Sequence, residues 1–421
     1  MPGQLTDIRS RLSTSSGERI CGIFRLRGWP KLQIYGYGRM KLDVGYMYGV
    51  FDKYLAMEQT TVLDILTGFW LAHRLGKPPV WIILMGPSSD GKTVLLDAFS
   101  GVDSVSAAKI TPKTIVSGYS APNTNGEDQK GLPGRFGREL NNKIWVVKDF
   151  SQIGSMRSDD RKEVFAQMRD LYDGHIEARY GTGMKVNENE LYVSFVAAST
   201  SDFEKAYIEQ QSLGTRHLIV RTTHTDDNEV LQKIRNVRGN EAIMKSALSA
   251  AVKAAFLREL RPEWIPISAA AESKLIELTT ILRTMRTYVS IDRYTNEVDE
   301  IPEREGIARA KKNIDKLFVG MMNIEGFTED RAIACIEHVV KSNIPRLRLQ
   351  AVELVAKSSL GVVLPSDLCA IAKVGMKTAS RHLNSLYALG VLDQKGNSWR
   401  ETQYWFSEEW QTKYRKWFTS K

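Results

Sequence analysis

A stretch of eight residues, GPSSDGKT from Gly86 to Thr93, has residue types and spacing suited to holding a phosphate. It follows the apolar run VWIILM, which predicts a buried strand, and precedes VLLDAF, which predicts the start of a helix. Glycines let the backbone wrap an anion, and free N–H groups at the helix start point at it. The lysine adds charge at the outer phosphates, and the threonine hydroxyl can bind Mg²⁺. We therefore expect a bound nucleotide and Mg²⁺, contacted by Gly86, Pro87, Ser88, Ser89, Asp90, Gly91, Lys92, Thr93 and Val94.

A second strand is expected to bring an acid to this loop, and KIWVVKDF, Lys143–Phe150, is the candidate. Counted from its four central apolar residues, Lys148 stands where a magnesium-binding Asp is usual, and Asp149 stands where a catalytic Glu is usual. If the strand is one residue longer, Asp149 is the metal-side acid and no Glu follows it. Asp149 is the predicted acid in both registers, and its role as metal ligand or base stays open.

Two further apolar runs predict strands whose ends meet the same loop. LYVSFVAAST, Leu191–Thr200, ends in hydroxyls, and Ser199 or Thr200 is expected to orient the attacking water. HLIVRT, His217–Thr222, follows directly after Arg216. Parallel strands with intervening helical segments predict an α/β fold.

A hairpin is expected between the acidic strand and the hydroxyl-ended strand. IEARYGTGMKV begins at Ile176, alternates, turns at Gly-Thr-Gly and continues beyond the turn. Arg179 and Lys185 flank the tip, which contains Thr182. Basic side chains on an exposed hairpin suit contact with the phosphates of a nucleic acid.

The order of these motifs resembles the AAA+ ATPases. The hairpin before the hydroxyl-ended strand resembles the branch with a pre-sensor-1 hairpin, which includes minichromosome-maintenance helicases and the superfamily-3 helicases of viruses and plasmids. The segments PVWIILMGPSSDGKT, WVVKDFSQI, LYDGHIEARYGTG and SLGTRHLIVR are similar to those of a group of bacterial and prophage ATP-binding proteins. The resemblance extends over about 58–222 and, more weakly, over the helical region beyond it.

The resemblance implies ATP as the nucleotide and a role for each matching residue. Thr200 or Ser199 corresponds to sensor 1, and Arg216 to an arginine finger that reaches the nucleotide of a neighbouring subunit, with Arg221 as the rival. Arg309, or alternatively Arg304, corresponds to sensor 2 on a lid helix. A finger acting between subunits implies a homo-oligomer, either a ring or a filament, and a six-membered ring is expected.

The chain divides into four expected parts. Residues 1–58 form a small N-terminal element, expected to be β-rich. Residues 59–222 form the AAA+ core, in which an amphipathic helix over Thr60–Arg74 leads into the strand before the phosphate loop. Residues 223–345 form an α-helical lid. Residues 346–421 look like a winged helix, with three helices and a hairpin around Lys395-Gly396-Asn397.

The C-terminal part is expected to bind DNA, because its third helix has the place of a recognition helix in the major groove. Lys341–Lys421 contain 13 Lys and Arg against 6 Asp and Glu, a surplus of seven out of nine for the whole chain. Such a local surplus favours a polyanionic partner. With the hairpin, the predicted DNA contacts are Arg179, Thr182, Lys185, Lys377, Thr378, Ser380, Arg381, Asn384, Lys395 and Arg400.

Composition restricts the remaining classes. Three cysteines, Cys21, Cys335 and Cys369, form no CxxC pair, which disfavours a zinc site or a disulfide framework. The longest apolar run is too short to span a bilayer, and the N-terminus lacks a signal-peptide core, so a cytoplasmic protein without a membrane partner is expected.

Three hypotheses follow for the function. The first is a DNA-stimulated ATPase motor, a ring-shaped replicative helicase or replication initiator of a phage or mobile element, with Lys92, Asp149, Thr200 and Arg216 as its catalytic residues. The second is an ATP-switched helicase loader, origin binder or transposition regulator that assembles on DNA without unwinding it. The third is a regulatory or defence ATPase whose winged helix binds protein.

Overall fold

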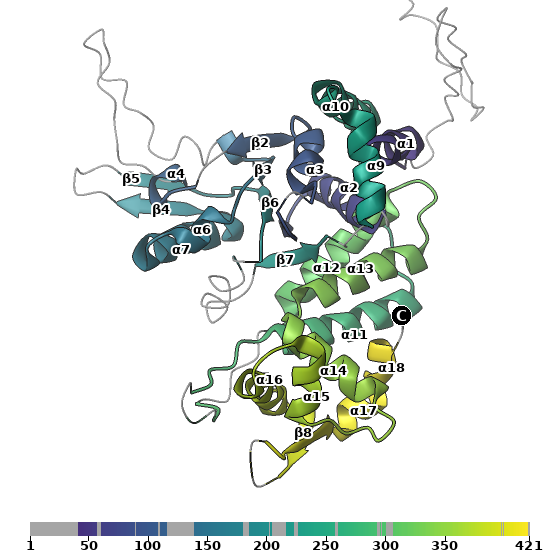
Figure 1. The fold of residues 1–421 in the computed structure, drawn as a ribbon. Helices are drawn as coiled ribbons and strands as arrows, with labels where there is room; N and C mark the ends of the chain where they lie inside the picture. The colour runs from purple at the N-terminus through teal and green to yellow at the C-terminus, as the bar shows by residue number, and fades with distance from the viewer. Residues whose placement is uncertain are drawn as a thin grey trace, which may run out of the picture. The chain divides into compact units, whose positions relative to one another are not determined.

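All four apolar runs predicted as strands lie in one five-stranded parallel sheet (Figure 1). The structure is a computed structural model that describes residues 41–56, 60–88, 90–107, 110–115, 139–179, 185–201, 203, 216–222, 226–256, 260–292, 295, 297–299, 306–396, 398 and 400–419. The strand order is β2-β3-β6-β1-β7. The bounds of the strands are β1 Trp81–Met85, β2 Ser104–Ala107, β3 Lys143–Val147, β6 Val193–Ser199 and β7 His217–Arg221.

Strand β2 was not predicted, because SVSA is short and only partly buried. The other strands are nearly continuous apolar runs, as expected for strands covered on both faces. Alternate side chains of β1 enter two separate cores: Ile82 and Leu84 join the larger one, and Trp81, Ile83 and Met85 the smaller. The sheet is therefore the middle layer of an α/β fold.

Helices cover both faces of the sheet. The smaller core is closed by α7 (Ser158–Asp173), with α4 (Pro112–Ile115) and α6 (Gln152–Ser155) beside it. The larger core contains α2 (Thr61–Arg74) and α3 (Lys92–Phe99) and continues into the helices that follow β7. Helix α2 differs from the amphipathic helix predicted, since nearly every side chain from Val62 to His73 is buried. It is a core helix enclosed by the helical region.

The regular elements in the described parts of 226–343 are helices, joined by extended segments and turns. The C-terminal end of α13 covers the free edge of β7: the Asn343 side-chain amide accepts from Ile219 N at 3.0 Å and donates to Ile219 O at 2.9 Å. This pairing satisfies an edge strand that would otherwise expose its backbone. The bounds are α9 Asp227–Val237, α10 Glu241–Phe256, α11 Ala269–Arg286, α12 Ile307–Met322 and α13 Glu329–Asn343.

The predicted basic hairpin consists of β4 (Ile176–Arg179) and β5 (Lys185–Glu188), paired antiparallel. Its tip, including Thr182, lies outside the described residues. Residues 1–40 also lie outside them, so the β-rich expectation there is untested. The described residues 41–56 contain the helix α1 (Gly45–Tyr54) and a single parallel bridge from Leu42 to Ile324.

The C-terminal part has the predicted three helices followed by a two-stranded hairpin. Pro365 is the first residue of the second helix, and the Asp367 side chain accepts from Leu364 N at 2.8 Å, which caps the helix start. The connection between the strands is longer than expected, running over 396–402. The bounds are α14 Arg346–Lys357, α15 Pro365–Ala372, α16 Met376–Ala388, β8 Leu392–Lys395, β9 Gln403–Phe406, α17 Glu408–Lys413 and α18 Arg415–Thr419.

A buried arginine joins this C-terminal part to the helical region. The Arg348 guanidinium donates to Met285 O at 2.9 Å, to Thr287 O at 2.6 Å and to Ser385 Oγ at 2.9 Å. It therefore links α14, α16 and the end of α11. Among the described helices, none is long and apolar enough to cross a membrane.

Candidate active site

The GPSSDGKT loop follows β1, which has a parallel neighbour on each side, and lies where these neighbouring strands end. Met85 is in register with Ser199 on one side and Arg221 on the other. Gly86 N donates to Ser199 O at 3.2 Å, and Thr222 N donates to Met85 O at 2.9 Å. Because β2 and β7 lie on opposite sides of β1, the loop is at a point where the chain direction across the sheet reverses, a common ligand position in open α/β sheets.

Gly86 is required by the close approach of its neighbours. A Cβ at this position would lie 1.9 Å from Thr222 Oγ1 and 2.8 Å from Asp90 Oδ2. Gly91, the N-cap of α3, has φ +71°, which favours glycine. Close side-chain packing thus explains Gly86, and backbone geometry explains Gly91, at which the loop turns directly into α3.

Lys92 is folded onto the loop that precedes it. Its side chain is buried, and Nζ donates to Gly86 O at 2.9 Å and also to Pro87 O. Burial lowers the pKa of Lys92, while the nearby Asp90 carboxylate acts in the opposite direction. The hydrogen-bond partners of this ammonium among the described residues are neutral carbonyls. It would therefore gain from contact with an anion, so the geometry suits a phosphate.

The remaining loop residues divide by exposure. Thr93 is exposed at the first turn of α3, where its hydroxyl is open to a ligand, and Val94 is partly buried against the larger core. Pro87 and Ser88 are exposed, whereas Ser89 lies outside the described residues.

Asp149 follows β3 as predicted, and the adjacent Lys148 forms an ion pair with a residue of α3. Asp149 is exposed, and its Oδ1 accepts from Ser151 N at 2.9 Å. Lys148, at the position where a metal-binding acid is usual, pairs with Asp97 of α3 at 2.6 Å. Asp97 lies one helical turn after Thr93, so a charge pair borders the expected magnesium position.

Three hydroxyls gather at the ends of β3 and β6. Ser151 Oγ lies 3.3 Å from Ser199 Oγ and 3.2 Å from Thr200 Oγ1, and it accepts from Thr200 N at 3.0 Å. Both predicted water-orienting residues, Ser199 and Thr200, are thus beside the loop. Ser199 is buried, while Thr200 is half-buried.

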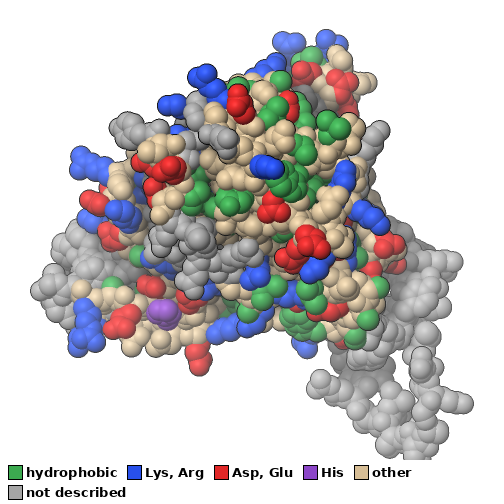
Figure 2. Space-filling view, turned by 90° about the horizontal axis from the view of Figure 1, so that it is seen from below, with side chains coloured by type: hydrophobic (Ala, Val, Ile, Leu, Met, Phe, Trp, Pro, Cys, Tyr) green, Lys and Arg blue, Asp and Glu red, His purple; other side chains and the backbone are tan. Residues whose placement is uncertain are grey.

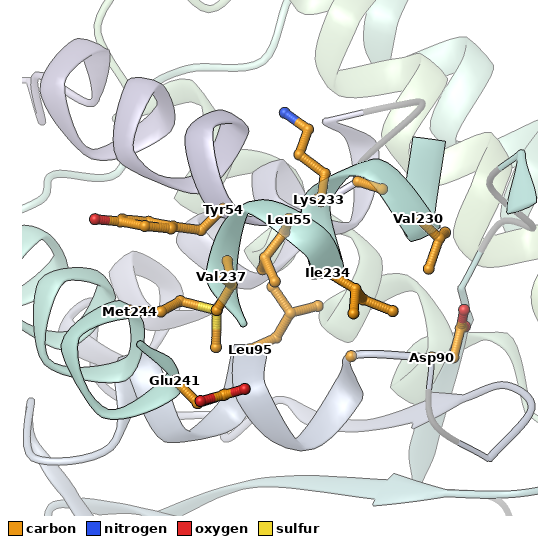
Figure 3. A pocket seen from close by; sticks show the side chains of 12 residues that line it. Tyr54, Leu55, Asp90, Leu95, Val230, Lys233, Ile234, Val237, Glu241 and Met244 are labelled. Atoms are coloured by element: carbon orange, nitrogen blue, oxygen red, sulfur yellow. The ribbon is translucent and has the colours of Figure 1, made fainter. Parts of the chain in front are cut away.

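An apolar cavity of about 270 Å³ adjoins the loop (Figure 3). Figure 3 shows Leu55, Leu95 and Ile234 between Asp90 on one side and Glu241 on the other. The helix α9 supplies much of the wall although it contributes little to the core, since Val237 is its buried residue. The lining residues are Tyr54, Leu55, Ala56, Asp90, Gly91, Leu95, Val230, Lys233, Ile234, Val237, Glu241 and Met244.

Arg216 lies at the opposite end of the sheet from the loop. It precedes His217, which is in register with Trp81, the first residue of β1. Its guanidinium pairs with Asp173 at 2.6 Å and lies over the Tyr172 ring at 5.7 Å. This position excludes contact with the nucleotide of its own chain and leaves a contact between subunits as a prediction.

The rival Arg221 lies at the loop end of the same strand. Its Nε donates to Ser342 O at 3.1 Å, and its Nη1 lies 3.3 Å from Met85 Sδ. The two arginines are thus at opposite ends of β7, and only Arg221 is beside the loop of its own chain.

Arg309 lies near Tyr172, away from the loop of its own chain, so its correspondence to sensor 2 stays a prediction. One turn further along α12, Asn313 accepts from Tyr172 OH at 2.9 Å. Burial raises the pKa of Tyr172, and Arg309 and Arg216 both oppose this shift. The first turns of α12 therefore lie near Arg216. Helix α12 packs against α2, and its Lys316 donates to Gly76 O and Pro78 O in the segment before β1. The alternative, Arg304, lies outside the described residues.

The hairpin places two like charges opposite each other. Arg179 and Lys185 are cross-strand partners at the outermost described pair, and both are exposed. Arg179 also lies 3.5 Å from Glu177 on its own strand. Like charges at directly opposite positions destabilise a hairpin, so an anion that contacts both would be stabilising.

On the predicted recognition helix α16, the candidate contacts split between surface and interior. Lys377 is exposed, and Thr378 and Arg381 are half-buried. Ser380 is fully buried, so the prediction that it contacts DNA is wrong. Asn384 Oδ1 accepts from Tyr404 OH at 2.5 Å, which holds this side chain against β9. Ser380 and Asn384 belong to the packing of the helix.

Lys395 and Arg400 are exposed on the hairpin β8-β9, as predicted. Figure 2 shows one face of the molecule on which Lys and Arg side chains alternate with Asp and Glu. The charge visible there is mixed, so the basic surplus of the C-terminal part does not form one uninterrupted field on this face.

The sequence interpretation missed Ser151, Asp97 and the cavity. Ser151 has a recognisable signal, because an Asp two residues before a Ser after a buried strand favours an Asx turn. Asp97 has one as well, since it lies four residues after Thr93 on a predicted helix. The cavity has no such signal, because its wall comes from helices separated by more than 170 residues in the sequence.

Comparison with known proteins found likenesses among solved structures alone. No family model matches the chain, and no curated protein matches it. A solved structure, "The A form apo structure of NrS-1 C terminal region-CTR", is similar over 87% of this chain and 76% of that chain, with 12% sequence identity and a TM-score of 0.25. A likeness at this level supports no functional argument, so the function must be argued from the residues.

Proposed function

We propose that this protein is an ATP-dependent DNA motor of the AAA+ type, a ring-shaped replicative helicase or replication initiator of a phage or mobile element. The observation that supports it most is the buried Lys92 at the N-terminus of α3, after β1. Within the described part of the chain, its hydrogen-bond partners are backbone carbonyls. Helix N–H groups and a desolvated ammonium together form a site for a polyphosphate.

The adjoining cavity supports a nucleotide over a simple phosphate. Its apolar wall meets the loop at Asp90 and Gly91, so a ligand with phosphates on the loop extends a flat apolar group into it. Sites of this kind are mostly apolar with a few polar groups that fix orientation. Tyr54 and Glu241, at the side away from the loop, are the polar groups for a nucleobase.

The residues at the loop also fit magnesium. The exposed hydroxyl of Thr93 and the exposed carboxylate of Asp149 are oxygen ligands of the type that Mg²⁺ prefers. The ion, when bound with ATP, would neutralise phosphate charge during transfer. Thr200 would orient the attacking water, and Arg216 of a neighbouring subunit would complete the site.

Two basic surfaces support DNA as the polymer on which the motor acts. The opposed Arg179 and Lys185 suit phosphate contact without reading sequence, which a moving part requires. The arrangement α14, α15, α16 and β8-β9 has the order of a winged helix. On it, Lys377 and Arg381 lie one turn apart, and Lys395 lies on the hairpin. The replication role rests on the resemblance in motif order.

Hydrolysis assays on purified protein test this proposal. Wild type should hydrolyse ATP with magnesium, faster when DNA is added, and Lys92→Ala should lower kcat/KM by about a hundredfold or more, because the phosphate loses its buried cation. Lys143→Ala, an exposed lysine at the start of β3, is the matched control and should hydrolyse ATP like wild type. Wild type without ATP binding, or full activity of Lys92→Ala, would contradict the proposal.

A second function is supported by the Lys148–Asp97 pair. Lys148 stands where a metal-binding acid is usual, and it pairs with Asp97 of α3 at 2.6 Å. The site therefore has one carboxylate fewer for binding metal or activating water, which would slow hydrolysis. Slow hydrolysis suits a switch that assembles on DNA when ATP binds. ATP-driven separation of a forked duplex distinguishes the two, since a motor separates strands and an assembly switch only binds them.

A further inference from the structure

We propose that Ser151 is a positioning residue that makes the Thr200 hydroxyl an acceptor for the water that attacks ATP. This inference rests on the proposed ATPase function. It starts from Ser151 Oγ, which lies within hydrogen-bond distance of Thr200 N, Thr200 Oγ1 and Ser199 Oγ.

The backbone around Ser151 is fixed on both sides. Phe150 N donates to Ala198 O at 2.8 Å, which continues the pairing of β3 with β6 beyond the end of β3. The Phe150 ring is fully buried and contacts the rings of Phe195 and Phe203. On the other side, Ser151 N donates to Asp149 Oδ1 at 2.9 Å. The position of the Ser151 hydroxyl is therefore set by the core and by the turn at Asp149.

Hydrogen-bond directions decide what Thr200 can do. Thr200 N has a proton to give, so Ser151 Oγ accepts from it at 3.0 Å. One arrangement uses every hydroxyl proton: Thr200 Oγ1 donates to Ser151 Oγ, Ser151 donates to Ser199 Oγ, and Ser199 donates to Thr200 O at 3.3 Å. In the reverse arrangement, Ser199 donates to Ser151 Oγ and Ser151 donates to Thr200 Oγ1. The Thr200 carbonyl then has no hydrogen bond from Ser199. The first arrangement is favoured because it satisfies more groups.

With its proton given to Ser151, Thr200 Oγ1 keeps its lone pairs for a donor at the loop. A water is such a donor, and its own lone pair then points toward the terminal phosphate. As the water oxygen bonds to phosphorus, the bond to the bridging oxygen of ADP breaks and the water proton passes to a phosphate oxygen. Thr200 therefore orients the water without deprotonating it, and Ser151 acts through Thr200.

Steady-state kinetics and nucleotide affinity of full-length variants test the proposal. Ser151→Ala should lower kcat by about ten- to a hundredfold, because the water is misplaced. The Kd for a fluorescent ATP analogue should stay within about twofold of wild type, since no contact with the phosphate loop is lost. Ser151→Thr should restore most of the activity. Ser155→Ala is the matched control, because this serine donates only to Gln152 O, at 2.8 Å, in the same segment.

A double-mutant cycle separates positioning from general destabilisation. If Ser151 acts through Thr200, then Ser151→Ala should change kcat little in a Thr200→Ala background. Multiplicative losses in kcat, a wild-type kcat in Ser151→Ala, or no rescue by Ser151→Thr would each overturn the inference. If wild type hydrolyses no ATP, the proposed function fails as well; if it hydrolyses ATP and Ser151→Ala does too, only the role of Ser151 fails.

Discussion

At the scale of single residues, a lysine buried outside the candidate site has the clearest measurable consequence. Lys316 of α12 is fully buried, and its ammonium donates to Gly76 O, to Pro78 O and to Tyr192 OH, the last at 3.0 Å. Three acceptors match the three N–H groups of an ammonium. Burial nevertheless lowers the pKa of Lys316 to about 7.

This lowered pKa predicts how stability depends on pH. Between pH 7 and 10.5 the unfolded chain binds the Lys316 proton more strongly than the folded chain does. The free energy of unfolding should therefore rise with pH across this window, by up to about 1.4 kcal/mol per pH unit from this group. The cost of burying the charge is fully present below pH 7.

Urea unfolding of wild type and Lys316→Met between pH 7 and 10 measures this contribution. The slope of the unfolding free energy against pH is compared between the two proteins. The difference between these slopes is the contribution of Lys316, because the other groups titrate in both proteins. Lys312→Met, an exposed lysine on the same helix, should keep the wild-type slope. Equal slopes for wild type and Lys316→Met would show that the three acceptors hold the pKa near its ordinary value.

At the scale of elements, the contact between α2 and α12 depends on two glycines that face each other. A Cβ on Gly320 would lie 2.2 Å from Gly68 O and 2.9 Å from Ala72 Cβ, and a Cβ on Gly68 would meet Met321 Cγ at 2.2 Å. The clash at Gly320 is with backbone, so no rotation of a side chain relieves it. The two helices approach as closely as their backbones allow.

Gly320→Ala should therefore lower the free energy of unfolding by about 1–3 kcal/mol, because the helices must separate inside a packed core. Alanine in place of an exposed glycine within a helix raises the free energy of unfolding, so Gly49→Ala in α1 is the control. It has nothing within 4 Å and should stabilise by about 0.5–1 kcal/mol. Chemical denaturation measures both, and a stable Gly320→Ala would mean that α2 and α12 can move apart without cost.

At the scale of the whole molecule, the position of Arg216 predicts that activity requires neighbouring subunits. Arg216 lies at the end of β7 remote from Lys92, so one chain cannot bring both to the same nucleotide. We expect Lys92→Ala and Arg216→Ala each to be inactive alone. A mixture should recover part of the activity, because some interfaces then combine an intact Lys92 with an intact Arg216.

The mixing assay has two controls. Arg216→Ala also removes the ion pair with Asp173, which could destabilise the fold. The thermal unfolding temperature of this variant must therefore be compared with that of wild type, and the assay is informative when the two match. Arg221→Ala tests the rival, which lies beside the loop of its own chain and should show no complementation with Lys92→Ala. No recovery in the mixture of Lys92→Ala with Arg216→Ala, while both variants stay folded and assemble, would remove Arg216 as the residue that acts between subunits.

Much of the local structure is determined by the sequence alone. The loop Gly86–Thr93, the strands before and after it, the hairpin and the C-terminal order of three helices and a hairpin were all predicted, because each depends on neighbours within about a dozen residues. Glycine positions, apolar periodicity and capping residues encode such structure directly. The basic surplus at the C-terminus is likewise a property of composition.

Only the tertiary structure decided which of these parts meet. Arg309 has the helical spacing of a site residue, yet α12 packs against α2 and brings it near Arg216 instead of the loop. Ser380 has the place of a recognition residue, yet the packing of α16 buries it. Ser151 became a candidate because β3 and β6 end side by side. Such contacts depend on long-range packing, and the spacing of residues along the chain does not specify which ends of distant elements lie together.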